Sequence, residues 1–311
     1  MLQRFTLDDV RGTYKKRDAW WTIFLVDPLA GRLVVPVANR TNITPNQLTI
    51  LAALLGIGAA ASFWQATTWW FIAGAVLFHL SFVIDCMDGK IARLKGTGSY
   101  FGVWLDFLFD RVRDLICAIA LFGGLERATG QVGYLYLGII FVSVNLFRYL
   151  DAAAVAKVRV SMNEAIARTC LEAGVPPTGY LKPPNPDDMA DGLEQSTPPT
   201  QVAVQVTGVH VPGLQQSFGR RFGWYYGFRE WLLKHRVRTH LFSGIEYQMT
   251  VLVVAPILQS FWSPAVAVLT ILGALLLLLF EATLVAKLWL STREIDPLLE
   301  RIRTPGHDAR P

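Results

Sequence analysis

The chain has 311 residues, 52% of them hydrophobic, and its 29 Lys and Arg against 24 Asp and Glu give a formal net charge of +5 at pH 7. The mean hydropathy is +0.36 and the apolar residues are gathered in long runs, which indicates an integral membrane protein. Three cysteines, two of them inside apolar runs, do not indicate a disulfide framework.

Residues 1–40 are expected to form a cytoplasmic arm that ends in an interfacial helix. The opening residues are polar, so we expect no cleavable signal peptide. Ala19–Ala38 mixes aromatic and aliphatic residues with charges such as Asp27, a pattern typical of a helix lying on a membrane surface. Trp20 and Trp21 are interpreted as anchors at that surface.

Six later segments are apolar over about the 20 residues that a helix needs to cross a bilayer. We therefore expect an all-α integral membrane fold with six transmembrane helices, at 47–64, 68–86, 100–123, 132–155, 245–262 and 265–288. The first four spans form a core domain at 41–155. The last two lie within 245–290, and a cytoplasmic tail follows at 291–311.

A long insert, residues 156–244, separates spans four and five and is expected on the cytoplasmic side. Its Pro-rich middle precedes an alternating segment, Val202–Val206, that predicts a short strand or hairpin. Its end, Arg220–Arg238, is basic and aromatic and suits a helix on an anionic membrane. No nucleic-acid-binding motif accompanies it, so we expect no nucleic-acid partner. A lid and an acceptor-selecting surface stay open as roles for the insert.

Lysine and arginine are distributed unevenly along the chain. They gather in the arm, after spans two and four, and in the tail, whereas the turns around Trp64–Thr68 and Ser260–Pro264 contain none. The positive-inside rule then places both termini at the cytoplasmic face, together with the charged ends of spans two and three. Any site at those ends would open to the cytoplasm.

Four aspartates lie toward those facing ends: Asp85, Asp88, Asp106 and Asp110. A charge at the bilayer centre costs roughly 2.5 to 3.5 kcal/mol, so ionisable groups in spans indicate function. The i,i+3 and i,i+4 spacings direct all four carboxylates from two antiparallel helices into one cleft. Carboxylate oxygens suit Mg²⁺ or Mn²⁺, and no His or Cys cluster indicates zinc. We expect two such ions and a ligand that carries a diphosphate.

The residues around these aspartates form an extended motif, Asp85-x-x-Asp88-Gly89-x-x-Ala92-Arg93, then eight residues, then Gly102-x-x-x-Asp106-x-x-x-Asp110. It resembles the signature of the CDP-alcohol phosphotransferase family of integral membrane enzymes. The resemblance implies transfer of a substituted phosphate group from a CDP-alcohol, such as CDP-diacylglycerol, to an acceptor alcohol. CMP would leave by metal-assisted direct displacement in phospholipid biosynthesis, and the enzyme would be a homodimer.

The resemblance also implies roles for single residues. The metal ligands would be Asp85, Asp88, Asp106 and Asp110, and Asp110 would also take the proton of the acceptor hydroxyl. The CDP moiety would be bound by Pro45, Asn46, Gly89, Ala92, Arg93, Ser99 and Gly102. Other interpretations stay open. Thr44 and Pro45 also suit an ordinary helix start, the small residues also suit tight helix packing, and Thr97 competes with Ser99.

Basic residues near the aspartates suggest where an acceptor phosphate binds. Arg111 and Arg148 are candidates for this contact, although Arg111 and Arg113 could instead pair with Asp110 or Asp114. Lys90 is interpreted as a solvated loop charge. Glu281, inside the last span, has no assigned role.

Two further functions remain as alternatives. The same chemistry could act on a soluble or specialised alcohol, because the motif does not mark the acceptor. A non-enzymatic membrane scaffold or transporter is disfavoured by the intact acidic motif and by the lack of visible internal repeats. The sequence does not identify the donor or the acceptor.

Overall fold

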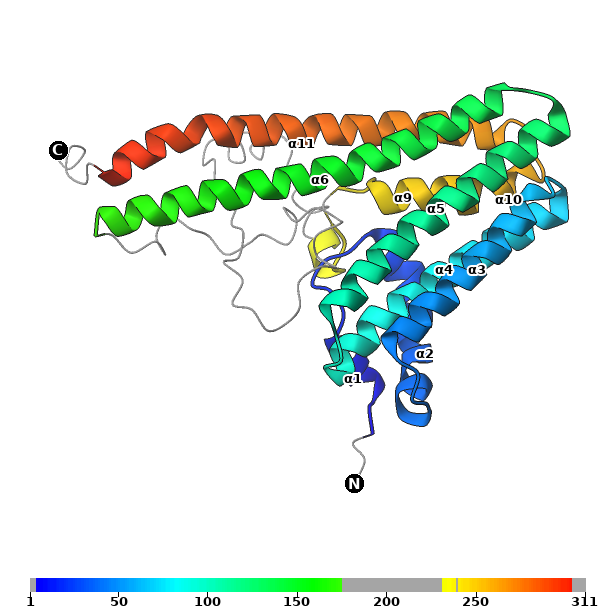
Figure 1. The fold of residues 1–311 in the computed structure, drawn as a ribbon, viewed down its shortest axis with the longest axis horizontal. Coiled ribbons are helices and arrows are strands. Elements are labelled where there is room, and N and C mark those ends of the chain that lie inside the picture. The colour runs from blue at the N-terminus through cyan, green and yellow to red at the C-terminus, as the bar shows by residue number, and fades with distance from the viewer. Residues whose placement is uncertain (1–3, 175–230, 239, 304–311) are drawn as a thin grey trace.

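The computed structural model describes residues 4–174, 231–238 and 240–303, and over these ranges the chain is helical, with no strand (Figure 1). The elements in chain order are α1 (Leu7–Gly12), the π-helix η1 (Thr22–Val26), α2 (Asp27–Arg40), α3 (Pro45–Trp64), α4 (Thr68–Lys95), α5 (Tyr100–Thr129), α6 (Gly133–Glu172), α9 (Gly244–Met249), the π-helix η3 (Thr250–Val254), α10 (Ala255–Gln259) and α11 (Ala265–Arg303).

Local sequence signals set the ends of the central helices. Thr44 and Gln47 form a capping box at the start of α3, where Pro45 occupies the first helical position. Gly96 ends α4 at φ +63°, a left-handed conformation that glycine adopts without strain. The turns between α3, α4 and α5 are short, so these helices run antiparallel as neighbours (Figure 1).

The buried core lies where α3, α4 and α5 meet α9, η3 and α10. Phe63, Phe78, Phe122 and Tyr247 are fully buried there. A Cβ on Gly124 of α5 would lie 2.7 Å from the carbonyl oxygen of Phe63, so only glycine permits this approach of α5 to α3. Large apolar side chains on the outer faces, such as Leu279, remain exposed within the chain, as expected for a surface that contacts lipid.

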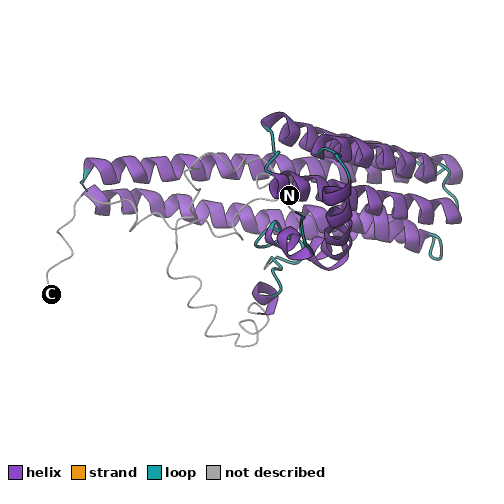
Figure 2. Cartoon of the chain, turned by 90° about the horizontal axis from the view of Figure 1, so that it is seen from below, coloured by secondary structure: helices purple, strands orange, loops and turns teal. Residues whose placement is uncertain are grey.

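The longest helices, α6 and α11, lie side by side and run in the same direction. Figures 1 and 2 show both extending well beyond the other helices. At the extended end Ile166 and Cys170 of α6 pack with Ile302 of α11. The helices therefore continue past the predicted spans 132–155 and 265–288.

Five helices are long and apolar enough to cross a membrane: Thr22–Arg40, Pro45–Trp64, Thr68–Lys95, Gly133–Glu172 and Ala265–Glu300. The integral membrane class is confirmed, but the expected count of six is not. The α5 helix has no uninterrupted apolar stretch long enough to span, because charged residues lie along it. The segment predicted to span 245–262 is divided into α9, η3 and α10.

The predicted interfacial helix is not confirmed either. Thr22–Arg40 is among the five helices that could span by length and composition. The interpretation of Trp21 as a surface anchor is wrong, because its side chain is buried and its ring meets His79 edge-on at 5.9 Å. Its position beside the α4 residue His79 makes Trp21 a packing residue.

Most of the predicted insert lies outside the described residues. This includes the Val202–Val206 segment and the first part of the basic segment Arg220–Arg238. The described end of that segment forms a helical turn at 231–234, and Val237 then makes an isolated parallel bridge with Asp18. The end of the insert therefore contacts the amino-terminal arm.

Candidate active site

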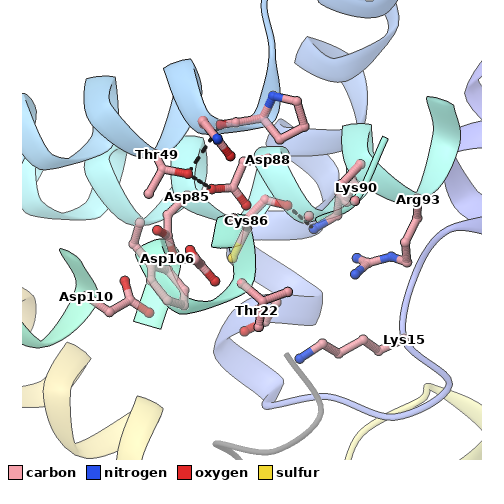
Figure 3. A pocket seen from close by; sticks show the side chains of 18 of the residues that line it. Lys15, Thr22, Thr49, Asp85, Cys86, Asp88, Lys90, Arg93, Asp106 and Asp110 are labelled. Carbon is pink, nitrogen blue, oxygen red and sulfur yellow. Dashed lines mark hydrogen bonds between the residues drawn. The ribbon is translucent and has the colours of Figure 1, made fainter. Parts of the chain in front are cut away.

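A cavity of about 140 Å³ lies at the end of the bundle where α4 ends and α5 begins. Its walls come from α3, α4 and α5, from the amino-terminal arm, and from α6 and α9. Figure 3 shows the aspartates in this cavity, with Lys15, Lys90 and Arg93 together on one side of them. The cavity is thus acidic in its centre and basic along one wall.

Three of the predicted aspartates form one compact cluster. Carboxylate oxygens of Asp85 and Asp88 on α4 and of Asp106 on α5 lie within 4.8 Å of one another. Among the described residues Asp106 Oδ1 is buried without a hydrogen-bond partner. Clustered carboxylates with a buried, unsatisfied oxygen fit a hard divalent cation, because such a cation supplies the missing partner and the opposing charge.

Thr49 holds one ligand of this cluster in place. Its Oγ1 donates to Asp88 Oδ2 at 2.5 Å from the facing helix α3, as the dashed line in Figure 3 marks. Both residues are buried. A hydroxyl that donates to a ligating carboxylate fixes its orientation, so α3 contributes to the cation site through Thr49.

The fourth aspartate, Asp110, lines the cavity but lies outside the compact cluster of three. Arg113 Nη2 donates to Asp110 Oδ1 at 2.6 Å, and Arg113 Nη1 lies 3.4 Å from Asp85 Oδ1. The guanidinium is buried and therefore serves as an internal counter-ion between two of the aspartates. The other carboxylate oxygen of Asp110, Oδ2, is not bonded to Arg113.

All seven predicted CDP-binding residues line the cavity: Pro45, Asn46, Gly89, Ala92, Arg93, Ser99 and Gly102. Ser99 caps α5 by accepting a hydrogen bond from the backbone N–H of Gly102 at 3.0 Å. A Cβ on Gly102 would lie 3.0 Å from Asn46 Oδ1, so the missing side chain lets α3 and α5 approach at this point. Thr97 also lines the cavity, so the choice between Ser99 and Thr97 stays open.

Another part of the cavity wall is formed by Arg111, Tyr149, Ile245 and Gln248. The Arg111 guanidinium lies 3.4 Å from the centroid of the Tyr149 ring, and its nearest carboxylate oxygens, on Asp110 and Asp114, are at 3.6 and 3.9 Å. Its buried Nε and Nη1 atoms make no hydrogen bond among the described residues. Gln248 donates to Asp114 and to the Tyr149 hydroxyl.

Arg148 is not brought together with the other predicted site residues. It is buried between α6 and α11, where its Nε lies 3.1 Å from Glu281 Oε1 and its guanidinium faces the Phe280 ring. It does not line the cavity. Glu281, to which the sequence assigned no role, is thereby the partner of Arg148. The predicted acceptor contact of Arg148 stays a prediction without support from this placement.

Lys90 is not a solvated loop charge, and that interpretation is wrong. Its side chain is 6% exposed, and Nζ lies 3.0 Å from Asp27 Oδ1 and donates to the Cys86 carbonyl. Asp27 in turn lies 3.4 Å from Arg236 Nη1. Tyr14 packs beside this group and donates to the Asp27 carbonyl, and burial raises the pKa of its phenol, which therefore stays neutral.

Sequence reasoning missed Asp27 and Gln248 as parts of the site, and it missed the contact of Thr49 with Asp88. Thr49 follows Pro45 and Asn46 at helical spacing, which could have indicated that it faces α4. The pairing of Arg113 with Asp110, one of the alternatives that the sequence left open, is present in the structure. Asp27 and Gln248 are far from the motif in the sequence, and no local pattern marks them.

Comparison with known proteins agrees with this geometry. Residues 42–178 match the family model for CDP-alcohol phosphatidyltransferase. This range contains the three aspartates of the cluster, Asp110, and every predicted CDP-binding residue.

The similar relatives include a phosphatidylinositol phosphate synthase from Corynebacterium glutamicum, 40% identical over 96 residues, which cover 30% of this chain and 41% of the relative. An archaetidylinositol phosphate synthase from Pyrococcus horikoshii is 41% identical over 87 residues, covering 27% of this chain and 44% of the relative. A bifunctional IPC transferase and DIPP synthase from Aquifex aeolicus is 32% identical over 112 residues, covering 35% of this chain and 25% of the relative.

The matched region spans less than half the length of each of these relatives. The family match covers most, but not all, of the residues that line the cavity. Residues 42–178 therefore resemble a CDP-alcohol phosphatidyltransferase domain, and they lie in a chain whose helices include five that are long and apolar enough to cross a membrane.

Proposed function

We propose that this protein transfers a substituted phosphate group from a CDP-alcohol, such as CDP-diacylglycerol, to an acceptor alcohol and releases CMP, as a step of phospholipid biosynthesis. The observation that carries the proposal is the cluster of Asp85, Asp88 and Asp106 within 4.8 Å, at the centre of a cavity with a basic wall. The domain match and the synthase names of the relatives support the same reaction class.

The basic wall suits the diphosphate of the donor. Arg93, Ser99 and Asn46 all line the cavity, and a guanidinium binds phosphate oxygens as a planar donor. Asp85, Asp88 and Asp106 would hold Mg²⁺ or Mn²⁺, and we expect two ions. When bound, such cations neutralise diphosphate charge and polarise phosphoryl oxygens. The small residues Gly89 and Ala92 leave room for the nucleotide near the α4 backbone.

Asp110 is proposed as the base that takes the proton of the acceptor hydroxyl. It lies one helical turn beyond Asp106, toward the end of the cavity formed by Arg111 and Tyr149. The bond from Arg113 fixes Oδ1 of Asp110 and leaves Oδ2 to face the acceptor. A carboxylate held in this way would accept the proton more readily at its other oxygen, which favours one direction of approach for the hydroxyl.

The acceptor is proposed to be a phosphorylated polyol. Arg111 has buried Nε and Nη1 atoms without hydrogen bonds among the described residues, and its ion pairs are long at 3.6 and 3.9 Å. A phosphate on the acceptor would satisfy these donors. The relatives named as inositol phosphate lipid synthases agree with an acceptor of this class. A specialised alcohol without phosphate is the second candidate.

The test is CMP release by the purified full-length protein in lipid nanodiscs. CDP-diacylglycerol is supplied with inositol phosphate, glycerol phosphate, inositol and glycerol in turn, with Mg²⁺ or with a chelator. We expect release with a phosphorylated polyol and Mg²⁺, and loss of release in Asp88→Asn. Release that persists in Asp88→Asn with the chelator present would falsify the proposal.

The orientation and the oligomeric state are part of the same proposal. The uneven distribution of lysine and arginine supports a site that opens to the cytoplasm. An engineered cysteine at Lys95, beside the Gly96 turn, should then be labelled only from the cytoplasmic side. The homodimer that the family resemblance implies is a prediction for light scattering of the detergent-solubilised protein.

A further inference from the structure

The amino-terminal arm forms part of the cavity wall through residues 13–18, which we call the strap. Lys15 and Asp18 line the cavity. Arg93, a residue of the extended aspartate motif, donates from Nε to the Thr13 carbonyl at 2.8 Å, so this motif is attached to the strap. The strap therefore adds a side to the cavity that α3, α4 and α5 do not provide.

The end of the insert, at residues 236–238, contacts the other edge of the strap. Arg236 donates from Nε and Nη2 to the Lys15 carbonyl at 3.1 and 2.6 Å. Asp18 and Val237 form the parallel bridge. In it the Asp18 N–H donates to the Arg236 carbonyl at 3.0 Å, and the Arg238 N–H donates to the Asp18 carbonyl at 3.1 Å. All of these contacts are made to the main chain of the strap, so they fix its path.

Asp27 connects this arrangement to the acidic motif. One of its oxygens lies 3.0 Å from Lys90 Nζ and the other 3.4 Å from Arg236 Nη1. Lys90 stands two residues after the cluster ligand Asp88, and the Tyr14 ring lies against both cations, at 5.4 and 5.0 Å from its centroid. Asp27 and Lys90 are both nearly inaccessible to solvent. A buried carboxylate between two cations has one low-energy arrangement, so it can set the relative position of the elements that carry them.

We propose that the strap is part of the donor-binding site and that Asp27 is a positioning residue, which holds the strap over the cavity through Lys90 and Arg236. The strap brings Lys15 to the same side of the aspartates as Arg93 (Figure 3). The ligand class is the diphosphate of a nucleoside-diphosphate-linked alcohol, which a wall of cationic side chains recognises. This inference rests on the proposed function, because the ligand is the donor of that reaction.

The first test is CDP binding by isothermal calorimetry, with Mg²⁺ and the full chain in detergent. If the strap is correctly placed in about a tenth of Asp27→Asn molecules, the apparent affinity for CDP falls about ten-fold. Arg236→Met, whose side chain is 33% exposed, should give a similar loss and covers the case in which Asp27→Asn fails to fold. Lys90→Arg, which keeps the charge, should bind more tightly than Lys90→Met. The matched control is Asp8→Asn, an exposed aspartate of the same arm that pairs with Arg11.

The second test reads the strap directly. Trypsin cleaves after Lys15, Lys16 and Arg17, so CDP with Mg²⁺ should slow this cleavage in the wild-type chain and much less in Asp27→Asn or Arg236→Met. In turnover assays the KM for the donor should rise while kcat at saturating donor stays close to wild type. A contact that only stabilises the fold would not raise the KM for the donor while leaving kcat unchanged.

The two proposals fail in different ways. If the wild-type chain binds no CDP, the proposed function fails and this inference fails with it. If the wild-type chain binds CDP while folded Asp27→Asn and Arg236→Met bind it equally well, the strap inference alone is overturned. CDP that leaves cleavage of the strap unchanged in the wild-type chain would also overturn it.

Discussion

Thr49 is expected to set how tightly the aspartate cluster binds its cation. Its hydroxyl lies 2.5 Å from Asp88 Oδ2, and the two residues are 3% and 7% exposed. A hydrogen bond to a charged group contributes about 1.5 to 3 kcal/mol, which corresponds to roughly ten- to a hundred-fold in binding. Thr49→Val keeps the shape of the side chain and removes the donor, so divalent-cation affinity should fall by about this factor.

The assay is Mn²⁺ binding followed by electron paramagnetic resonance, together with the Mg²⁺ concentration that gives half-maximal CMP release. Thr49→Ser retains the hydroxyl and should stay close to wild type. Thr283→Val is the matched control, since the Thr283 hydroxyl donates to the Leu279 carbonyl on an exposed face of α11. Wild-type Mn²⁺ affinity in Thr49→Val would refute the idea that Thr49 orients Asp88.

Three further predictions concern the rest of the site. Asp110→Asn should lower single-turnover rates by about 10² to 10⁴ while CDP binding measured by calorimetry persists, because an amide cannot take the acceptor proton; lost CDP binding would instead make Asp110 chiefly a ligand of the metals. Arg111→Met should raise the KM for a phosphorylated acceptor and leave the KM for the CDP-donor unchanged, and equal effects on both would contradict an acceptor contact. Arg148→Met should destabilise the protein by about 3 to 5 kcal/mol in detergent unfolding, since it leaves Glu281 buried and unpaired, whereas Arg148→Met with Glu281→Met should recover most of this loss.

The fold was predictable where hydropathy and capping coincide. The predicted spans at 47–64 and 68–86 fall within α3 and α4, because an apolar run and a capping box mark the start of α3. The ends of α6 and α11 were not predictable in this way. Beyond the apolar run α6 continues through Ala-, Arg- and Glu-containing sequence, which favours helix but carries no membrane signal.

The site residues also differ in whether local spacing in the sequence or only the folded structure relates them. The spacing of Asp85, Asp88 and Asp106 follows from helix geometry, and the structure brings these three together. Asp27 and Arg236 are 209 residues apart in the chain, so no periodicity relates them. Lys90 shows the same limit, because its burial depends on Asp27 in the amino-terminal arm and not on its own helix.

The helices α6 and α11 are longer than a bilayer is thick. With 40 and 39 residues each helix is roughly 60 Å long, about twice the hydrocarbon thickness of a bilayer. A helix of this length that crosses the bilayer once has about half of its length outside the hydrocarbon. The half beyond the apolar runs, where Ile166 and Cys170 of α6 pack with Ile302 of α11, is therefore expected to project from the membrane as a pair of helices.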